Sequence, residues 1–203
     1  MKTIAIEGLC FAGKSTLARG LLNHFGTSQC VILLDYSDLA KPADRPEVPA
    51  KTLAEEINAL RYYIEIDKRR WAPILASNFR HPIVIQDRCF HTLLAHAYSN
   101  GKTSLFDPLP EAKIFLLSQT DIIRPDVVFY LDAREDVLLD RYKTIPNAID
   151  DLFKSRDYMM NFREYFTEFF AGETEEIFFI DANKPIVQVQ HMAISILQTL
   201  DVC

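Results

Sequence analysis

The sequence has no excess of basic residues. It carries 22 lysine and arginine residues against 28 aspartate and glutamate residues, a formal net charge of −6 over 203 residues. Proteins that bind nucleic acid or a membrane surface through charge normally carry a basic excess. The composition therefore argues against both partners, although it leaves room for a local basic pocket.

Cysteine is scarce, and long apolar runs are missing. The four cysteines form no C-x-x-C pair, so we expect neither a disulfide framework nor a cysteine-based metal or redox site. No apolar run approaches the roughly 18 residues that cross a bilayer, and the apolar start of the chain ends at Glu7, too early for a signal peptide. These absences favour a cytoplasmic protein, and the length favours one domain over residues 1–203.

Short apolar runs alternate with stretches of helical periodicity along the chain. The periodic stretches predict helices, and the segment 36–50 predicts a loop because it holds three prolines. Such alternation predicts an α/β fold, with a parallel sheet covered by helices on both faces. The expected strands are 2–7, 31–34, 82–86, 127–131 and 177–180, and the expected helices are 14–25, 52–79, 91–98, 109–119, 135–143, 154–170 and 185–200.

An aspartate follows or ends each of the four later strands. These residues are Asp35, Asp87, Asp132 and Asp181. Ligands of open parallel sheets bind at the carboxyl edge of the strands, where these carboxylates would gather. Carboxylates at that edge suit metal–phosphate chemistry, although aspartate is also common in turns without any such role.

The segment that follows the first strand matches a phosphate-binding loop. Residues 8–16 read Gly-Leu-Cys-Phe-Ala-Gly-Lys-Ser-Thr, the pattern G-x-x-x-x-G-K-[ST] between a strand and a helix. Glycines let the main chain wrap an anion, and the helix N-terminus adds positive potential. We expect Lys14 to reach the β- and γ-phosphates of ATP and Ser15 to hold Mg²⁺. The ATP-binding set from this loop is Gly8, Ala12, Gly13, Lys14, Ser15 and Thr16.

The phosphate loop alone does not show whether the bound nucleotide is hydrolysed or gives its phosphoryl group to an acceptor. The sequence has no Asn-Lys-x-Asp guanine signature, and it is short for a motor, so a compact kinase of a small metabolite is the favoured class. Asp87 and Arg88 end the third strand as a carboxylate and a cation. We expect Asp87 to help organise Mg²⁺ and Arg88 to stabilise charge on the phosphoryl group in transfer.

These features together resemble the thymidylate kinase family and, more loosely, its deoxynucleoside kinase relatives. Besides the phosphate loop, the matching segments keep the order and spacing of that family over nearly the whole chain. They are Asp87-Arg88, 124–132 (Arg-Pro-Asp-Val-Val-Phe-Tyr-Leu-Asp), Asp140-Arg141, 162–165 (Phe-Arg-Glu-Tyr) and 180–185 (Ile-Asp-Ala-Asn-Lys-Pro).

The resemblance implies a three-layer phosphate-loop fold with strand order 2-3-1-4-5 and a mobile lid at about 142–156. It places Ala182, Asn183 and Lys184 beside the adenine of ATP. A lid arginine would complete the positive clamp on closure, with Arg141 the first candidate and Arg156 the second. A homodimer is also compatible with the sequence.

The acceptor half departs from the family pattern. The Arg-Glu-Pro-Gly-Gly segment expected after the second strand is replaced by Asp35-Tyr36-Ser37-Asp38, and Arg69 and Arg70 lie near the expected place of an acceptor arginine. A hydroxyl acceptor needs a carboxylate to take its proton, which Asp35 supplies. A phosphate acceptor needs cations, which Arg69 and Arg70 would supply. Tyr36 and His91 complete the predicted acceptor site.

Three functions remain open on the sequence. The first is a thymidylate kinase-like enzyme that phosphorylates dTMP or a related nucleoside monophosphate. The second is a kinase of a nucleoside or other small-molecule hydroxyl, with Asp35 as the base. The third is a nucleotide-binding regulator without catalysis, against which the complete set Lys14, Ser15, Asp87 and Arg88 argues.

Overall fold

The computed structural model describes residues 1–76, 82–144, 151–170 and 175–202. Its centre is a five-stranded parallel sheet in the order β2-β3-β1-β4-β5, which confirms the expected α/β fold and strand order. The strands are β1 (Lys2–Glu7), β2 (Cys30–Leu33), β3 (Ile83–Asp87), β4 (Val127–Asp132) and β5 (Glu176–Asp181).

The central strands are apolar on both sides because helices cover both faces of the sheet. Ile4 in β1 pairs with Ile85 in β3 and with Val127 in β4, and all three side chains are buried. This register brings the ends of β1 and β3 together, with Ile6 opposite Asp87. The loops that follow these two strands therefore meet at one place on the carboxyl edge.

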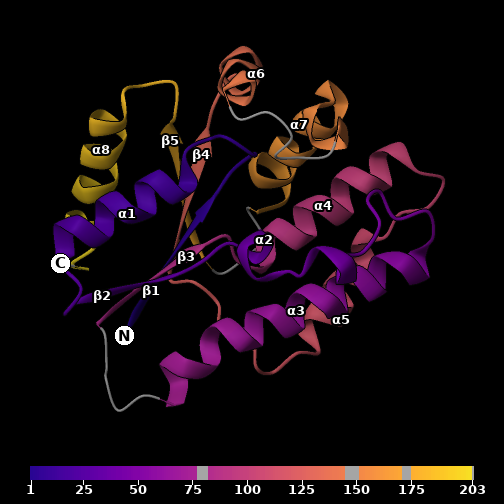
Figure 1. Cartoon of the computed structure of the whole chain (residues 1–203), viewed down its shortest axis with the longest axis horizontal. Helices are drawn as coiled ribbons and strands as arrows, with labels where there is room; N and C mark the ends of the chain where they lie inside the picture. Colours follow the sequence, from indigo (N-terminus) through magenta and orange to yellow (C-terminus); the bar gives the residue numbers. More distant parts are fainter. Residues whose placement is uncertain (77–81, 145–150, 171–174, 203) are drawn as a thin grey trace.

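Two groups of helices flank the sheet (Figure 1). The helices α1 (Lys14–Phe25) and α8 (Ile186–Thr199) pack together on one side. On the other side lie α3 (Leu53–Ala76), α4 (Phe90–Thr103) and α5 (Leu109–Leu117). The helices α6 (Glu135–Lys143) and α7 (Arg156–Glu164) stand at the top of the view, and α7 packs against α4. Within the described residues, no helix is both long and apolar enough to cross a membrane.

The predicted loop 36–50 is wrong at its start. The structure has a short helix α2 (Tyr36–Leu39) and a 3₁₀ turn at Pro42–Asp44. Asp35 caps α2, since its Oδ1 accepts a hydrogen bond from the Ser37 main-chain N at 2.8 Å. The three prolines all follow Leu39, so they do not prevent this capped turn.

The predicted end of the helix expected at 91–98 is also wrong. The corresponding helix α4 continues through Asn100 and Gly101 to Thr103. Gly101 serves a different purpose, because a Cβ there would lie 2.9 Å from Cδ of Pro108. The glycine allows the following loop to approach the helix closely rather than ending it.

The predicted helix 154–170 is divided in the structure. A 3₁₀ turn at Asp151–Lys154 precedes α7, and a π-helical turn at Tyr165–Phe169 follows it. The lid expected at about 142–156 includes 145–150, which lie outside the described residues, as do 77–79 of the helix expected at 52–79. The other strands and helices agree with the prediction to within one or two residues at most ends.

Candidate active site

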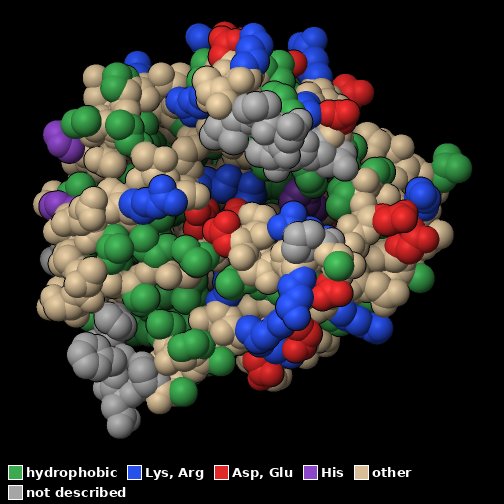
Figure 2. All heavy atoms as spheres, in the orientation of Figure 1, with side chains coloured by type: hydrophobic (Ala, Val, Ile, Leu, Met, Phe, Trp, Pro, Cys, Tyr) green, Lys and Arg blue, Asp and Glu red, His purple; other side chains and the backbone are tan. Residues whose placement is uncertain are grey.

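Two cavities open at the carboxyl edge of the sheet, and Figure 2 shows a hollow on this face where basic, acidic and histidine side chains gather. The smaller, of about 590 Å³, lies at the predicted phosphate loop and is called the loop cavity here. The larger, of about 760 Å³, lies between α3, α4 and the segment 45–51 and is called the inner cavity. Cys10, Asp35 and Arg88 line both cavities. These three residues therefore mark the junction between them.

The phosphate loop depends on two glycines. Gly8 has φ +137°, and a Cβ there would lie 2.8 Å from the main-chain oxygen of Leu131. Gly13 precedes α1 with φ +102°, in the left-handed region that side chains disfavour. Together they turn the chain between β1 and α1 so that the helix begins at the loop cavity. The first turn of α1 holds no acidic residue, so its positive end is free to attract an anion.

Lys14 lies at the base of this loop. Its side chain is buried, and Nζ donates a hydrogen bond to the main-chain oxygen of Leu9 at 2.9 Å. Burial lowers the pKa of Lys14, and the charge of Arg88 lowers it further, while nearby carboxylates oppose the change. Ala12, Ser15 and Thr16 line the loop cavity with Lys14, as predicted for the ATP-binding set.

Arg88 connects the phosphate loop to the start of α4. Its Nη1 donates to the main-chain oxygen of Gly8 and to Oγ1 of Thr92, each at 3.2 Å, and its Nη2 lies 3.7 Å from Sγ of Cys10. The residue has φ +68°, a conformation rarely adopted by residues with a side chain. Buried Glu7 supports this corner, because its carboxylate accepts hydrogen bonds from Cys89 N and from the Thr92 hydroxyl.

Asp35 faces Arg88 across the junction. Oδ2 of Asp35 accepts a hydrogen bond from Nε of Arg88 at 2.8 Å. Burial acts to raise the pKa of Asp35, but Arg88, Lys14 and the Ser37 main-chain N outweigh it and lower this pKa to about 2. The carboxylate therefore stays ionised at neutral pH beside both cavities.

Arg141 reaches the loop cavity from α6. Its Nη1 donates to the main-chain oxygens of Phe11 and Ala12 at 3.1 and 3.2 Å, and Nη2 donates to that of Ala182 at 2.8 Å. The guanidinium thus ties the phosphate loop to the segment after β5. Arg156 is exposed and lies 3.5 Å from Glu135 Oε2, away from this cavity lining.

The segment after β5 forms another wall of the loop cavity. Ala182 and Lys184 line it. Asn183 is exposed and holds the turn together, since its Oδ1 accepts from Arg134 N at 2.9 Å and its Nδ2 donates to Asp181 at 2.7 Å. The fold thus brings both predicted ATP-binding segments to the loop cavity. Asn183 does not line the cavity but stabilises the turn that positions Ala182 and Lys184.

A protein-only metal centre is absent from the described part of the chain, where no three histidine, cysteine or acidic side chains cluster suitably. The two residues predicted to hold Mg²⁺, Ser15 and Asp87, differ in their exposure to solvent. Ser15 lies exposed at the loop cavity, and Asp87 is buried with an Oδ1 that has no hydrogen-bond partner among the described residues. Asp87 also acts electrostatically on Lys14. Asp87 lines neither cavity, so its unpartnered oxygen would reach a cation held by phosphate oxygens only through water.

Arg70 does not lie in the inner cavity, contrary to its predicted role as an acceptor-binding residue. It is buried, forms an ion pair with Asp67, and donates to the main-chain oxygens of Leu34, Asp87 and Arg88 at 2.6, 3.2 and 3.1 Å. Its guanidinium also lies 4.1 Å from the ring centroid of Tyr36. Arg70 is therefore a brace that joins the ends of β2 and β3 behind the junction.

We expect Arg70→Ala to lower the free energy of unfolding by about 3 kcal/mol or more, because the substitution leaves Asp67 as an uncompensated buried charge. Arg69→Ala is the matched control, since Arg69 is exposed on the same helix and should change stability by only about 0.5 kcal/mol. Urea unfolding of both variants measures the difference. Equal, small effects for the two variants would contradict the bracing role.

The other predicted acceptor residues separate into two groups. Tyr36 lines the inner cavity, as predicted, and its hydroxyl points to Asp67 at 3.4 Å. Arg69 is exposed and bonds to the main-chain oxygen of Glu65, and it does not line either cavity. His91 is fully buried, with Nδ1 at 3.1 Å from the Tyr165 hydroxyl and Nε2 at 3.6 Å from Glu175. Arg69 and His91 therefore line neither of the two cavities.

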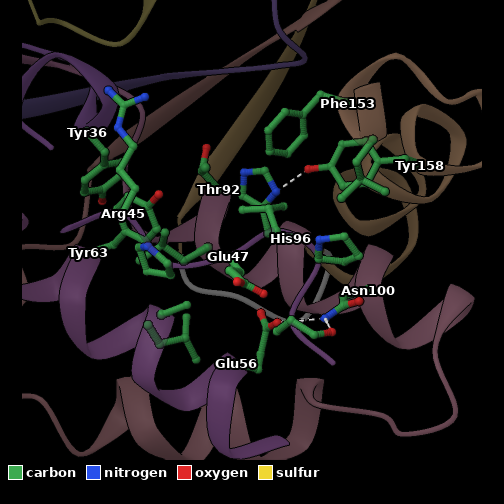
Figure 3. A pocket seen from close by; sticks show the side chains of 18 of the residues that line it. Tyr36, Arg45, Glu47, Glu56, Tyr63, Thr92, His96, Asn100, Phe153 and Tyr158 are labelled. Carbon is green, nitrogen blue, oxygen red and sulfur yellow. Dashed lines mark hydrogen bonds between the residues drawn. The ribbon is translucent and has the colours of Figure 1, made fainter. Parts of the chain in front are cut away.

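Residues outside the predicted acceptor set form further walls of the inner cavity. Thr92, His96 and Asn100 follow one another at intervals of four along α4, and all three line it (Figure 3). Tyr158 bonds through its hydroxyl to Nδ1 of His96, and the ring centroid of Phe153 lies 5.4 Å from that of His96. Burial lowers the pKa of His96 to about 3, so this histidine is neutral at physiological pH.

The sequence contains patterns that indicate some of these cavity-lining residues. The fourfold spacing of polar residues on α4 indicates one helix face. Glu56 follows Leu53 by three positions and precedes Leu60 by four, so a carboxylate lies on an otherwise apolar face of α3. Tyr158 belongs to an aromatic run whose helical spacing is more typical of a core, which hid its position at the cavity.

Comparison with known proteins agrees with this geometry. A family model described as thymidylate kinase matches residues 6–193. The chain belongs to the thymidylate kinase family. A curated thymidylate kinase of Malacoplasma penetrans (strain HF-2) is 22% identical over 210 residues, which cover 92% of this chain and 90% of that relative.

Solved structures share the fold of this family member. Deoxyadenosine kinase from M. mycoides with bound dATP superposes with a TM-score of 0.69 at 16% sequence identity, over 97% of this chain and 99% of the other. The same enzyme with bound dCTP gives a TM-score of 0.66 over the same shares, also at 16% identity. Family membership confirms the predicted phosphotransferase of the nucleotide and nucleoside kinase type, and it argues against a regulator without catalysis.

Proposed function

We propose that the chain transfers the γ-phosphoryl group of ATP to a hydroxyl group of a nucleoside bound in the inner cavity. The observation that carries the proposal is the position of Asp35, which lines both cavities at their junction. A triphosphate on the phosphate loop and an acceptor in the inner cavity would meet there. Phosphoryl transfer needs chiefly in-line positioning and charge stabilisation, which such a meeting point provides.

The charges at the junction favour a hydroxyl acceptor. A hydroxyl must lose its proton during transfer, and an ionised Asp35 is placed to orient it and take that proton. An acceptor phosphate is already anionic and needs cations instead. Arg70 is committed to Asp67 and to three main-chain oxygens, and Arg88 is paired with Asp35. Neither guanidinium could therefore bind an acceptor phosphate without giving up its present partners.

The remaining predicted residues have assigned roles in the proposed reaction. Lys14 would bind the β- and γ-phosphates, and Arg88 and Arg141 would neutralise charge near the transferred group. Ser15 would hold Mg²⁺ directly or through water, and Asp87 would do so through water. The ion would supply charge neutralisation to the phosphate oxygens when bound.

A second candidate is phosphorylation of a nucleoside monophosphate, dTMP included. Two observations favour it: the family match to thymidylate kinase, and the presence of Arg45 and Lys51 in the lining of the inner cavity. Lys51 pairs with Glu47 at 3.3 Å, and Arg45 donates to main-chain oxygens of Ser37 and Ala40. Either cation would have to exchange these partners for an acceptor phosphate.

An acceptor panel separates the two candidates. With ATP and Mg²⁺, we expect ADP release that depends on deoxynucleosides and exceeds that with the corresponding monophosphates by at least about tenfold in kcat/KM. The reason is that each described cation in the lining of the inner cavity already has a partner. Product analysis would locate the new phosphate on the sugar hydroxyl. Turnover confined to monophosphates, with a diphosphate product, would establish the second candidate instead.

A further inference from the structure

The inner cavity has a polar end far from the junction. Glu56 on α3 and Asn100 on α4 meet there, with Asn100 Nδ2 donating to Glu56 Oε2 at 2.8 Å. The same nitrogen donates to the main-chain oxygen of Ala50 at 3.2 Å. Both side chains are buried apart from the surface that they present to the cavity. Figure 3 shows this pair at the side of the cavity away from Tyr36 and Thr92.

The distance between the two ends suits a nucleoside. Thr92 contacts Arg88 at the junction, and Asn100 lies eight residues further along α4, a rise of about 12 Å. On α3, Tyr63 packs against Tyr36 near the junction, and Glu56 lies seven residues away, about 10 Å. A nucleoside whose sugar hydroxyl is at Asp35 would therefore extend its base toward Glu56, past the ring of His96.

At this end the Asn100 amide has no donor left for a ligand, whereas Glu56 offers an acceptor. Both hydrogens of Asn100 Nδ2 are used, and its Oδ1 accepts from the Ser104 hydroxyl at 2.8 Å. The second carboxylate oxygen of Glu56 makes no hydrogen bond to any described residue. A ligand group that covers this oxygen must therefore donate a hydrogen bond to it, because an oxygen left unpaired under the ligand costs binding free energy.

We propose that Glu56 determines acceptor specificity by accepting a hydrogen bond from an exocyclic amino group of the base. Adenine and cytosine carry such an N–H₂ group at N6 and N4, whereas guanine and thymine present the acceptors O6 and O4 at the corresponding position. A carboxylate next to O4 would place two acceptors together. The inference rests on the proposed function, because it requires a nucleoside or nucleotide with its sugar end at Asp35. It predicts a preference opposite to the one expected of a thymidylate enzyme.

The test measures equilibrium binding without ATP, so that it is independent of turnover. The first pair, deoxyadenosine and purine deoxyriboside, differs only in the amino group. In the second pair, deoxycytidine and deoxyuridine, a carbonyl group replaces the amino group. Each ligand is also tested as its monophosphate. We expect the amino-bearing member to bind the wild-type protein about tenfold tighter or more, the discrimination typical of a good base contact. Equal affinities within the pairs would overturn the inference.

Glu56→Gln exchanges the free acceptor for a donor. The glutamine oxygen can keep the bond from Asn100, and its amide nitrogen would then face the base. We expect deoxycytidine to lose its advantage and deoxyuridine to bind as tightly or more tightly. Glu65→Gln is the matched control, because Glu65 is exposed on the same helix and pairs only with Lys68 among the described ion pairs. An unchanged ligand preference in a folded Glu56→Gln variant would also overturn the inference.

The two proposals fail in different ways. If the amino-bearing ligands bind more tightly but nucleosides are not phosphorylated, the proposed function is wrong. The assignment of Glu56 then still holds, because the monophosphate pairs test it independently of nucleoside phosphorylation. Should nucleosides be phosphorylated without regard to the amino group, the function stands and the assignment of Glu56 is wrong. The wild-type ligand pairs decide the second question even if Glu56→Gln does not fold.

Discussion

Replacing Lys14 by alanine should lower kcat by at least about two orders of magnitude while the fold is retained, as expected for a lost charge partner of the transition state. Lys14 is the buried cation of the phosphate loop, and its Nζ bonds only to the main-chain oxygen of Leu9 among the described hydrogen bonds. The substitution therefore removes no side-chain partner. Steady-state kinetics with ATP and the best acceptor from the panel measures the effect.

The control for this prediction is Lys2→Ala. Lys2 is exposed at the opposite end of β1, so the same change of residue there should leave kcat within about twofold, as usual for surface substitutions. Thermal unfolding of both variants checks that the fold is intact. Near-normal turnover by a folded Lys14→Ala protein would contradict the assignment of the phosphate loop as the donor site.

Replacing Asp35 by asparagine should have the second large effect, a loss of about 10²- to 10⁴-fold in kcat with a hydroxyl acceptor, the range for removal of a general base. Asp35 uses both oxygens, one for Ser37 N and one for Arg88, and asparagine has a single carbonyl oxygen. The variant thus loses the proton acceptor and weakens the hold on Arg88. Affinity for ATP with Mg²⁺ should change far less than kcat, since Lys14 and the main chain of the phosphate loop keep their residues.

Asp38→Asn provides the comparison for Asp35→Asn. Asp38 is exposed one turn further along α2 and lines neither cavity. Because the pKa of Asp35 is lowered to about 2, the wild-type rate should show no acid limb from this group between pH 5 and 8, and Asp35→Asn should depress the rate uniformly over that range. A loss confined to low pH, or an equal loss in Asp38→Asn, would argue against Asp35 as the proton acceptor.

The donor half of the site could be predicted from the sequence because its chemistry is local. A phosphate loop is contiguous, so Gly8, Gly13, Lys14 and Ser15 are brought together by a single strand–turn–helix. The parallel sheet and its carboxyl edge followed from the alternation of strands and helices, and the strand order followed from the family resemblance. Asp35 and Arg88 were also identified, since each directly follows or flanks the end of a strand at that edge.

The acceptor half could not be predicted in the same way because it is assembled from distant segments. Arg69 and Arg70 are adjacent in the sequence, yet one is exposed and the other buried, since neighbouring positions on a helix point about 100° apart. His91 lies one position before the cavity face of α4 and points into the core. Only packing decides which of such polar residues face a cavity, and composition or spacing alone does not specify it.

The way Arg70 is bonded has a consequence for substitutions at the other end of the inner cavity. Its three partners beyond Asp67 are main-chain oxygens of Leu34, Asp87 and Arg88, so the brace does not depend on the side chains at those positions. Positions 56 and 100, at the other end of the inner cavity, take no part in it. Under the proposed function, substitutions at positions 56 and 100 would therefore change the base end of the acceptor site while leaving the Arg70 contacts at the junction intact.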